Sequence, residues 1–372
     1  MSTAFARPIR VGVVGASPGR GWGTAAHLPA LLGLEEYTVT AVATTKPDSA
    51  RRTAAAFGIE HAFADVGELA AHPDVDVVAA VVRAPGHAEA VRTALAHGKH
   101  VVSEWPLGVN LAEAVELAEA ATAAGVVHAV VLQGFHSHPA AFVKELIAEG
   151  RIGELESITV VAAGDPLGGD RIFPDLAWSV DPAAGSNLLT IMAGHFLAMA
   201  EHLAGPLTEV SASLAYRHRE VVVAETGERV PSGVPSHVAA HGLLESGATA
   251  ALSVHGGGGT PSGFQIKITG NEGALTVTPV RSSEYMHWGD WTIVHSAPDG
   301  TRAELPLPSH HAPPGGFRGP ATHIAAFYRR VAPAFAEGRQ AFPSFHDAVR
   351  QHRVLAAVEH ASRTGARQKI VP

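Results

Sequence analysis

Short apolar segments alternate with alanine-rich segments over the N-terminal part of the chain. The apolar segments carry Val, Ala and Ile at consecutive positions, which is typical of strands buried on both faces of a parallel sheet. We expect such strands at residues 9–14, 38–43, 76–82, 100–104 and 127–133, with crossover helices at 21–34, 48–57, 86–97 and 110–124. This alternation predicts an α/β domain with a doubly wound parallel sheet of the Rossmann type.

The pattern changes after Gly150. From about residue 152 to residue 294, strand-like segments are separated by glycine-containing turns at hairpin spacing, which predicts an α+β region with an open, mostly antiparallel mixed sheet. The expected helices of this C-terminal part lie at 140–149, 187–204, 321–337 and 344–363, and a Pro-, Gly- and His-rich loop is expected at 306–320.

A chain of 372 residues is too long for a single compact core. We therefore expect two domains: a dinucleotide-binding domain at 1–133 and a substrate and oligomerisation domain at 134–372. The C-terminal helices, over 321–363, could pack back on the first domain.

The composition narrows the range of partners. The formal net charge is −8 and no run of Lys or Arg stands out, so we expect neither nucleic acid nor an anionic membrane as a partner. The chain has no cysteine, which excludes disulfides and thiolate metal sites. Its 23 histidines show no ligand spacing such as H-E-x-x-H, so no metal site is expected. The apolar run that ends at Gly15 is too short for a signal segment or a membrane span, which predicts a cytoplasmic protein.

A glycine-rich segment follows the first expected strand and precedes the first expected helix. Glycines at this place let the backbone approach a diphosphate, and the N–H groups at the helix start bind it. The loop is about two residues longer than a compact G-x-G-x-x-G, and a glycine-rich loop without a ligand is the alternative. The residues that we assign to the cofactor are Gly15, Ala16, Ser17, Gly19, Arg20, Gly21 and Trp22.

The end of the second strand decides between the two nicotinamide cofactors. A site for NAD places Asp or Glu there to bind the ribose hydroxyls, whereas this chain has Thr44, Thr45 and Lys46. Hydroxyls and a cation suit a 2′-phosphate, so the sequence favours NADP, with NAD as the alternative. If Lys46 is only a solvated loop residue, both cofactors could bind.

The segment between Asp76 and Gly153 resembles the glucose-fructose oxidoreductase/inositol dehydrogenase (Gfo/Idh/MocA) family. The resemblance rests on the motifs DVDVVAAVV, APGH, HGKHVVSEWPLGVNLAEA, LQGF and VKELIAEGRIG, and on ITGNEGALTV further along the chain. It implies a Rossmann domain followed by an open mixed sheet, an active site between them, and homodimers or homotetramers formed through the sheet. It also implies cofactor contacts from Ala84, Pro85, His87, Glu104 and Trp105.

Two positions depart from that family. Its dehydrogenases carry Glu-Lys-Pro where this chain has Glu104-Trp105-Pro106, and they place an Asp before a catalytic His where this chain has Asn187 and His195. The Trp in the Lys position, the motif LQG-x-x-S at the start of the linker segment and the VPSH segment at 234–237 resemble a branch of the family that contains the galactose-regulon repressor of fungi.

Two main functions follow. The first is an enzyme that transfers a hydride between the nicotinamide and a sugar, cyclitol or keto-sugar carbon. His195 would be its acid/base, because a histidine titrates near neutral pH. Glu104 would lie beside the nicotinamide, and Trp105 would be an apolar wall or a stacking platform. The residues that we expect to contact the polyol or keto-sugar substrate are Gln133, His136, His138, Asn187 and Trp288.

The second function is a regulator that binds the dinucleotide without turning it over, and a lyase or hydrolase that uses the cofactor is a third reading. The loss of Lys and Asp supports a regulator. Against it, the segments 286–291 and 309–311, rich in His and Trp, look like small-molecule pocket material. His136, His138 and His195 could each instead be structural.

Overall fold

The computed structural model describes residues 7–19, 21–163, 167–257, 263–281, 285–287, 289–313 and 315–371. The chain divides into two compact units, which we describe separately. Unit 1 comprises Met1–His136 and Pro313–Val349, and unit 2 comprises Ser137–Ala312 and Arg350–Pro372. Both units therefore contain a segment from the C-terminal part of the chain.

Unit 1 is built on a six-stranded parallel sheet with the order β3-β2-β1-β4-β5-β6. The strands are β1 (Ile9–Val14), β2 (Tyr37–Ala43), β3 (His61–Phe63), β4 (Val77–Ala80), β5 (His100–Glu104) and β6 (His128–Val131). The strand order reverses between β1 and β4, and ligands of such sheets bind at the carboxyl ends of the strands beside this switch point. We call this edge of unit 1 the carboxyl edge. The predicted Rossmann-type sheet is confirmed.

The helices of unit 1 follow the strands along the chain. They are the π-helix η1 (Gly23–His27), α1 (Leu28–Leu32), α2 (Pro47–Phe57), α3 (Val66–Ala71), the 3-10 turn η2 (Ala84–Gly86), α4 (His87–Ala96), α5 (Leu111–Ala123), the 3-10 turn η3 (Gln133–His136) and α8 (Pro320–Glu337). α8 supplies Ile324, Phe327 and Tyr328 to the same apolar core as β1. The single helix expected at 21–34 is a π-helix followed by an α-helix, and β3 and α3 were not expected.

Unit 2 contains a nine-stranded mixed sheet with the order β17-β16-β15-β14-β7-β13-β12-β9-β18. Within this sheet, the β7 and β13 pair is the only parallel one among the described strands, so the predicted mostly antiparallel sheet is confirmed. The strands are β7 (Leu155–Ala163), β9 (Leu207–Ala215), β12 (His237–Leu244), β13 (Thr249–His255), β14 (Gly263–Gly270), β15 (Gly273–Pro279), β16 (Trp291–Ser296), β17 (Arg302–Glu304) and β18 (Gln368–Lys369). A second sheet joins β8 (Arg171–Ile172), β10 (Glu220–Val223) and β11 (Arg229–Pro231).

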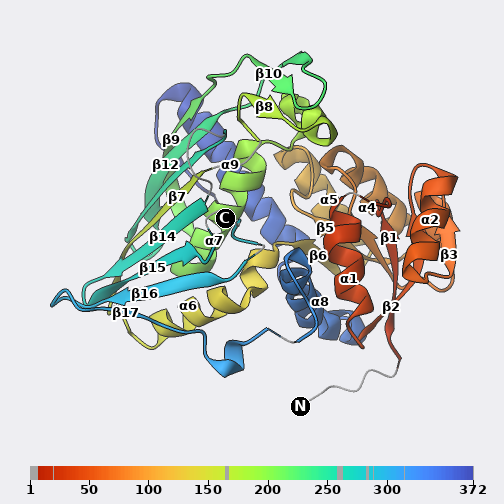
Figure 1. Ribbon diagram of the computed structural model, residues 1–372, viewed down its shortest axis with the longest axis horizontal. Coiled ribbons are helices and arrows are strands. Elements are labelled where there is room, and N and C mark those ends of the chain that lie inside the picture. The colour runs from red at the N-terminus through yellow and green to blue at the C-terminus, as the bar shows by residue number, and fades with distance from the viewer. Residues whose placement is uncertain are drawn as a thin grey trace. The chain divides into compact units, whose positions relative to one another are not determined.

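Helices cover one side of the nine-stranded sheet (Figure 1). They are α6 (His138–Ala148), α7 (Gly194–Ala204) and α9 (Phe345–Thr364). Shorter helical segments of the same part of the chain are the 3-10 helices η4 (Pro174–Val180), η5 (Pro182–Ala184) and η7 (Ser309–His311) and the π-helix η6 (Leu188–Ala193). The helix expected over 187–204 is a π-helix up to Ala193 and an α-helix after it. The segment Pro182–Ala204 is long and apolar enough to cross a membrane, but 78% of its most apolar window is buried, as in a core helix.

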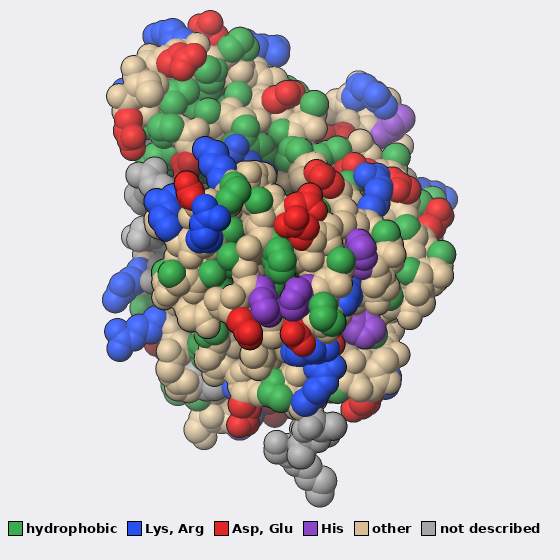
Figure 2. All heavy atoms as spheres, turned by 90° about the vertical axis from the view of Figure 1, so that its right-hand side faces the viewer, with side chains coloured by type: hydrophobic (Ala, Val, Ile, Leu, Met, Phe, Trp, Pro, Cys, Tyr) green, Lys and Arg blue, Asp and Glu red, His purple; other side chains and the backbone are tan. Residues whose placement is uncertain are grey.

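One face of the molecule is shown with its side chains in Figure 2. Acidic and basic side chains are interspersed over it, and no continuous basic area is visible on this face (Figure 2).

Candidate active site: a carboxyl edge and a ring cluster

The glycine-rich loop begins directly at the end of β1. Gly15 has a φ of +104°, and its N–H donates to the carbonyl of Ala43 at 2.9 Å. A Cβ atom at Gly15 would lie 2.7 Å from the Val81 carbonyl oxygen, so no other residue fits without moving backbone. The loop therefore starts in a narrow space between the ends of β2 and β4.

The middle of this loop is open. Gly19 and Gly21 have φ values of +83° and +110°, and a Cβ on either would meet nothing within 4 Å. The Gly21 carbonyl accepts from the N–H of Ala25 at 3.0 Å, which begins the helix there. The first N–H groups of a helix have no partner within it, so the loop offers donors and free space to a diphosphate. Arg20 lies outside the described residues.

The end of β2 carries the residues expected at the adenosine ribose. The Thr44 N–H donates to the Phe63 carbonyl at 3.2 Å, and its hydroxyl donates to the Lys46 carbonyl at 3.0 Å. Thr45 and Lys46 are exposed at the start of α2. Nearby, Arg51 pairs with Asp48, whereas Lys46 makes no ion pair among the described residues.

A buried hydrogen-bond chain holds Glu104 at the end of β5. Its Oε1 accepts from Trp22 Nε1 at 3.2 Å and lies 2.7 Å from His27 Nε2. The other ring nitrogen of His27 lies 2.8 Å from the Tyr328 hydroxyl. Because a carboxylate only accepts, a neutral His27 donates to Glu104 and accepts from Tyr328. Burial and the Glu104 carboxylate raise the pKa of the Tyr328 hydroxyl, which keeps that donor protonated.

The remaining predicted residues of unit 1 are mostly buried. Trp105 is 4% exposed and Ala84 is also buried, while Pro85 continues the η2 turn. His87 fixes two turns, since its ring nitrogens lie 2.7 Å from the Pro106 carbonyl and 2.9 Å from the Val82 carbonyl.

Gln133 and His136 end the chain of unit 1 before it enters unit 2. Gln133 is 3% exposed, and its Oε1 has no hydrogen-bond partner among the described residues. A buried acceptor of this kind can accept a hydrogen bond from the hydroxyl of a bound ligand. The His136 ring packs instead on Phe327 and Phe342, and burial lowers its pKa to about 4.

Unit 2 gathers aromatic rings near His195, the second residue of α7. The ring centroids of His195 and His287 lie 4.0 Å apart, and those of His287 and Tyr285 lie 4.7 Å apart, both edge to face. We call His195, His287 and Tyr285 the ring cluster. A π-helical segment, η6, places His195 here, and such segments occur often at functional sites.

Burial alone lowers the pKa of His195 to about 3. The sequence argument used the ordinary titration of histidine, and the structure changes it: His195 is neutral over the whole physiological range. Asn187, expected to contact substrate, caps η6 through its side-chain oxygen, which accepts from Leu189 at 2.9 Å.

Three other predicted features lie elsewhere in unit 2. His138 is the first residue of α6 and is half-buried. Trp288 lies outside the described residues. His310 and His311 contact the Glu145 carboxylate at 3.2 Å and 2.8 Å, which ties their loop to α6.

Sequence reasoning missed several residues of the site. His27 and Tyr328 are 301 positions apart, and no spacing connects them. His287 belongs to the segment that was interpreted as pocket material, so its composition was the only available signal.

The sheet with its switch-point loop defines unit 1 as a dinucleotide-binding domain. A family model described as "Oxidoreductase family, NAD-binding Rossmann fold" matches residues 9–132, and one described as "Gal80p, C-terminal domain" matches residues 140–279. The chain is 30% identical over 250 residues to the dehydrogenase aclE of Aspergillus oryzae, covering 65% of this chain and 68% of that protein. The chain therefore belongs to the Gfo/Idh/MocA oxidoreductase family, and its C-terminal part is of the Gal80 type.

Two further comparisons find similarity to a regulatory protein and to a dehydrogenase. The chain is 27% identical over 292 residues to the galactose/lactose metabolism regulatory protein GAL80 of Kluyveromyces lactis, covering 73% of this chain and 64% of that protein. A solved levoglucosan dehydrogenase in complex with NADH and L-sorbose has the same fold, with a TM-score of 0.82, 23% identity and coverage of 98% and 99% of the two chains. The matched part thus spans about two thirds of the first curated relatives, 64% and 68%.

Proposed function

We propose that the protein is an NAD(P)-dependent oxidoreductase that acts on a hydroxyl or carbonyl carbon of a sugar, cyclitol or keto-sugar. The observation that carries the proposal is the ring cluster, in which His195, in the first turn of α7, contacts a second buried histidine, His287. Family membership and the open glycine loop support cofactor use. The sugar class rests on a relative named levoglucosan dehydrogenase, to which the chain is 30% identical over 175 residues.

Bound nicotinamide would accept or supply the hydride. The chain's own residues would then bind, orient and move a proton. Gly19 and Gly21 would leave room for the diphosphate, and the chain from Tyr328 through His27 would fix the Glu104 carboxylate. The unpartnered oxygen of Gln133 would accept from a hydroxyl of the cofactor ribose or of the substrate.

We propose His195 as the group that exchanges the proton of the reacting hydroxyl. Burial makes its imidazole a weak base, with a pKa of about 3, so it would accept that proton only as the loss of hydride turns the hydroxyl into a strongly acidic protonated carbonyl. The T-shaped contact with His287, against which Tyr285 packs in turn, would fix the orientation of the ring. Trp105 occupies the position that the family resemblance assigns to Lys, and an indole cannot carry the proton.

We propose NADP as the preferred cofactor and NAD as the alternative. Lys46 supports this choice because its ammonium has no acidic partner among the described residues, in contrast to Arg51, whose charge Asp48 already balances. The hydroxyl of the exposed Thr45 would add a donor to the 2′-phosphate.

A dinucleotide-binding regulator without turnover is the second candidate. The match to the Gal80-type C-terminal domain and the missing Lys favour it. Exchange of Trp105 separates the two functions. In an enzyme adapted to Trp, we expect Trp105→Phe to retain most turnover and Trp105→Lys to lower it, because a buried ammonium disturbs the apolar wall. Melting curves would check that both variants fold. No turnover of any sugar by any variant, with the cofactor bound, would favour the regulator.

We further propose that the protein forms homo-oligomers through the uncovered side of the nine-stranded sheet. That side carries small residues such as Ala239 and Ala251 and the exposed Val161 and Leu243, mixed with polar residues of the same strands such as Thr159, His241 and Ser253. Protein interfaces commonly combine apolar contacts with hydrogen bonds in this way. Light scattering at micromolar concentration should give a dimer or tetramer mass, and a monomer mass would contradict the proposal.

A further inference from the structure

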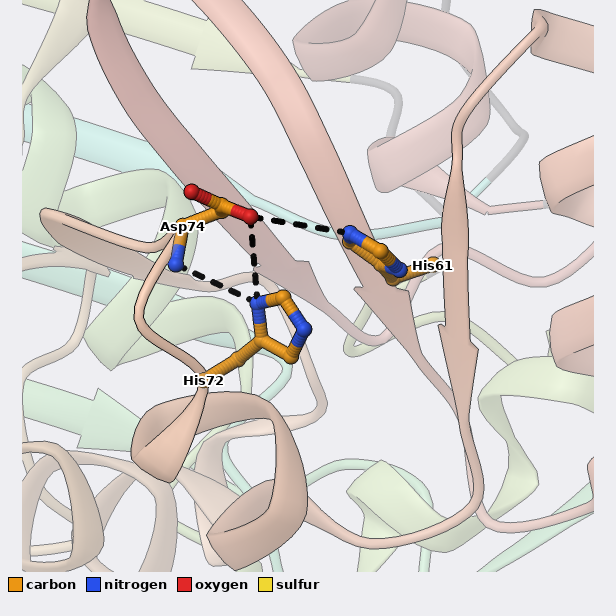
Figure 3. Close-up of side chains that lie close together, drawn as sticks. All are labelled: His61, His72 and Asp74. Atoms are coloured by element: carbon orange, nitrogen blue, oxygen red, sulfur yellow. Dashed lines mark hydrogen bonds and ion pairs between the residues drawn. The ribbon is translucent and has the colours of Figure 1, made fainter.

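A group of three polar side chains lies on unit 1, away from its carboxyl edge. His61 is the first residue of β3, His72 follows the end of α3, and Asp74 precedes β4. Because β3 and β4 belong to one parallel sheet, these residues lie at its amino-terminal edge, opposite to the end that receives the dinucleotide. Figure 3 shows both imidazole rings pointing toward the carboxylate.

The spacing of the three ligand atoms suits a metal ion better than direct hydrogen bonds. Asp74 Oδ2 lies 4.0 Å from His61 Nε2 and 4.0 Å from His72 Nδ1, and all three atoms lie within 4.8 Å of one another. Hydrogen bonds between such groups are about 2.7–3.2 Å long. A tetrahedral zinc ion with bonds of about 2.0–2.2 Å separates its ligands by about 3.4 Å, so each of the two distances from Asp74 Oδ2 would shorten by about 0.6 Å on binding.

Two observations indicate that this arrangement lacks a partner. His61 Nε2 is buried and has no hydrogen-bond partner among the described residues, which is costly for a ring nitrogen. Arg10 binds the other oxygen of Asp74, Oδ1, at 2.5 Å, so Oδ2 remains available. His72 Nδ1 accepts a long bond of 3.2 Å from the Asp74 N–H, which an ion would replace.

The rings are already positioned by packing. The centroids of His61 and His72 lie 4.1 Å apart, and the Phe63 ring lies 5.7 Å from that of His72. Little side-chain freedom would therefore be lost on binding. Glu60 Oε2, 3.9 Å from His61 Nε2, could complete the coordination, or water could.

The second histidine group of the chain provides a contrast. His310 and His311 contact Glu145 at 3.2 Å and 2.8 Å, and these are hydrogen-bond distances. Their nitrogens are satisfied without an ion. Direct hydrogen bonds therefore account for the arrangement of His310, His311 and Glu145. They do not account for the arrangement of the first group, whose ligand atoms are too far apart.

We propose that His61, His72 and Asp74 form a binding site for a zinc ion. Two imidazole nitrogens and one carboxylate oxygen are ligands that zinc prefers, whereas Mg²⁺ and Ca²⁺ prefer oxygen alone. The bound ion links the edge strand β3 to the segment before β4. Since the Phe63 carbonyl at the other end of β3 accepts from Thr44, the ion also stabilises the strand that supports the expected ribose site.

Calorimetric titration of the chelator-treated full-length protein with ZnCl₂ tests the site. To remove the other histidine group, the titration uses the His310→Ala/His311→Ala background. We expect one saturable site there. Its affinity should fall at least ten-fold in His61→Ala and in Asp74→Asn, and should be unchanged in His97→Ala, which removes an exposed histidine of the same unit.

Thermal melting supplies a second readout that does not depend on activity. Zinc at about one hundred times its Kd should raise the melting temperature of the background protein by roughly 3–8 °C. The same zinc should not raise it in His61→Ala, whose own melting curve shows whether the variant folds. Absence of saturable binding in the background protein, or equal affinity in all variants, would overturn the proposal.

Discussion

The carboxyl edge of unit 1 and the ring cluster of unit 2 are built by different means. At the edge, hydrogen bonds fix the polar groups, as Trp22 and His27 fix Glu104. In the cluster, ring packing and burial dominate, and burial lowers the pKa of His195 to about 3. The edge therefore suits a ligand that is held in one orientation. The cluster holds a weak neutral base, which accepts a proton only from a strongly acidic group, such as the hydroxyl of a carbon that is losing hydride.

Removal of the His195 ring should have the largest effect. We expect His195→Ala to lower turnover by roughly 10²–10⁴-fold, the range for loss of a general acid or base. The dinucleotide Kd should not change, because the edge is intact. Steady-state kinetics and cofactor titration measure both quantities. His360→Ala, at an exposed position on α9, is the control. An equal loss of turnover in both variants, or unchanged turnover in His195→Ala, would refute the role of the cluster.

An added methyl group in the glycine-rich loop should weaken cofactor binding at the carboxyl edge and leave the ring cluster unchanged. Gly15→Ala combines a strained φ with a contact of 2.7 Å to the Val81 carbonyl, so we expect a loss of about 1–3 kcal/mol in stability and cofactor binding weaker by at least about ten-fold. Gly19→Ala introduces only the backbone strain and should cost less stability. Denaturant unfolding and cofactor titration compare the pair. A smaller stability loss for Gly15→Ala than for Gly19→Ala would show that the close approach is unimportant.

Reversal of one charge should alter cofactor choice alone. We expect Lys46→Asp to weaken NADPH binding by more than about ten-fold, since a charge-assisted bond to phosphate becomes a repulsion, and to leave NADH nearly unchanged. Arg52→Asp makes the same change of charge further along α2. Calorimetric titrations of each of the two variants with NADPH and with NADH give the four affinities to compare. Equal losses for NADPH and NADH in Lys46→Asp would rule out a 2′-phosphate site at this residue.

The smallest effect concerns pH. Since the pKa of His195 is lowered to about 3, the ring loses its free lone pair only as the pH falls toward that value. Turnover should therefore show no inflection near pH 6.5 that belongs to this residue, and it should be flat between about pH 5 and 8 as far as His195 is concerned. A pH profile of kcat/KM measures this. A fall centred near pH 6.5, absent in His195→Gln with residual activity, would show that His195 titrates normally.

The same contrast explains how far the sequence could lead. The strands of unit 1 were predictable because consecutive Val, Ala and Ile mark buried parallel strands, and the glycine loop was predictable from its place after β1. β3 and α3 were missed because three and six residues are too short to show a period.

The ring cluster was accessible to sequence reasoning only in part. The family resemblance pointed to His195, but its contact with His287 joins α7 to a turn far along the chain, which no local pattern reports. The pKa of His195 depends on burial by many side chains, so the sequence could supply only the ordinary value. The zinc ligands share neither a helix nor a regular spacing, because three separate elements supply them.

The most direct test of the central claim is absorbance near 340 nm. The purified protein is incubated with NADP or NADPH, and in parallel with NAD or NADH, and with a panel of sugars, cyclitols and keto-sugars. We expect at least one substrate to change the absorbance of the nicotinamide, and His195→Ala to abolish the change while still binding the cofactor. Cofactor binding without an absorbance change for any member of the panel would contradict hydride transfer.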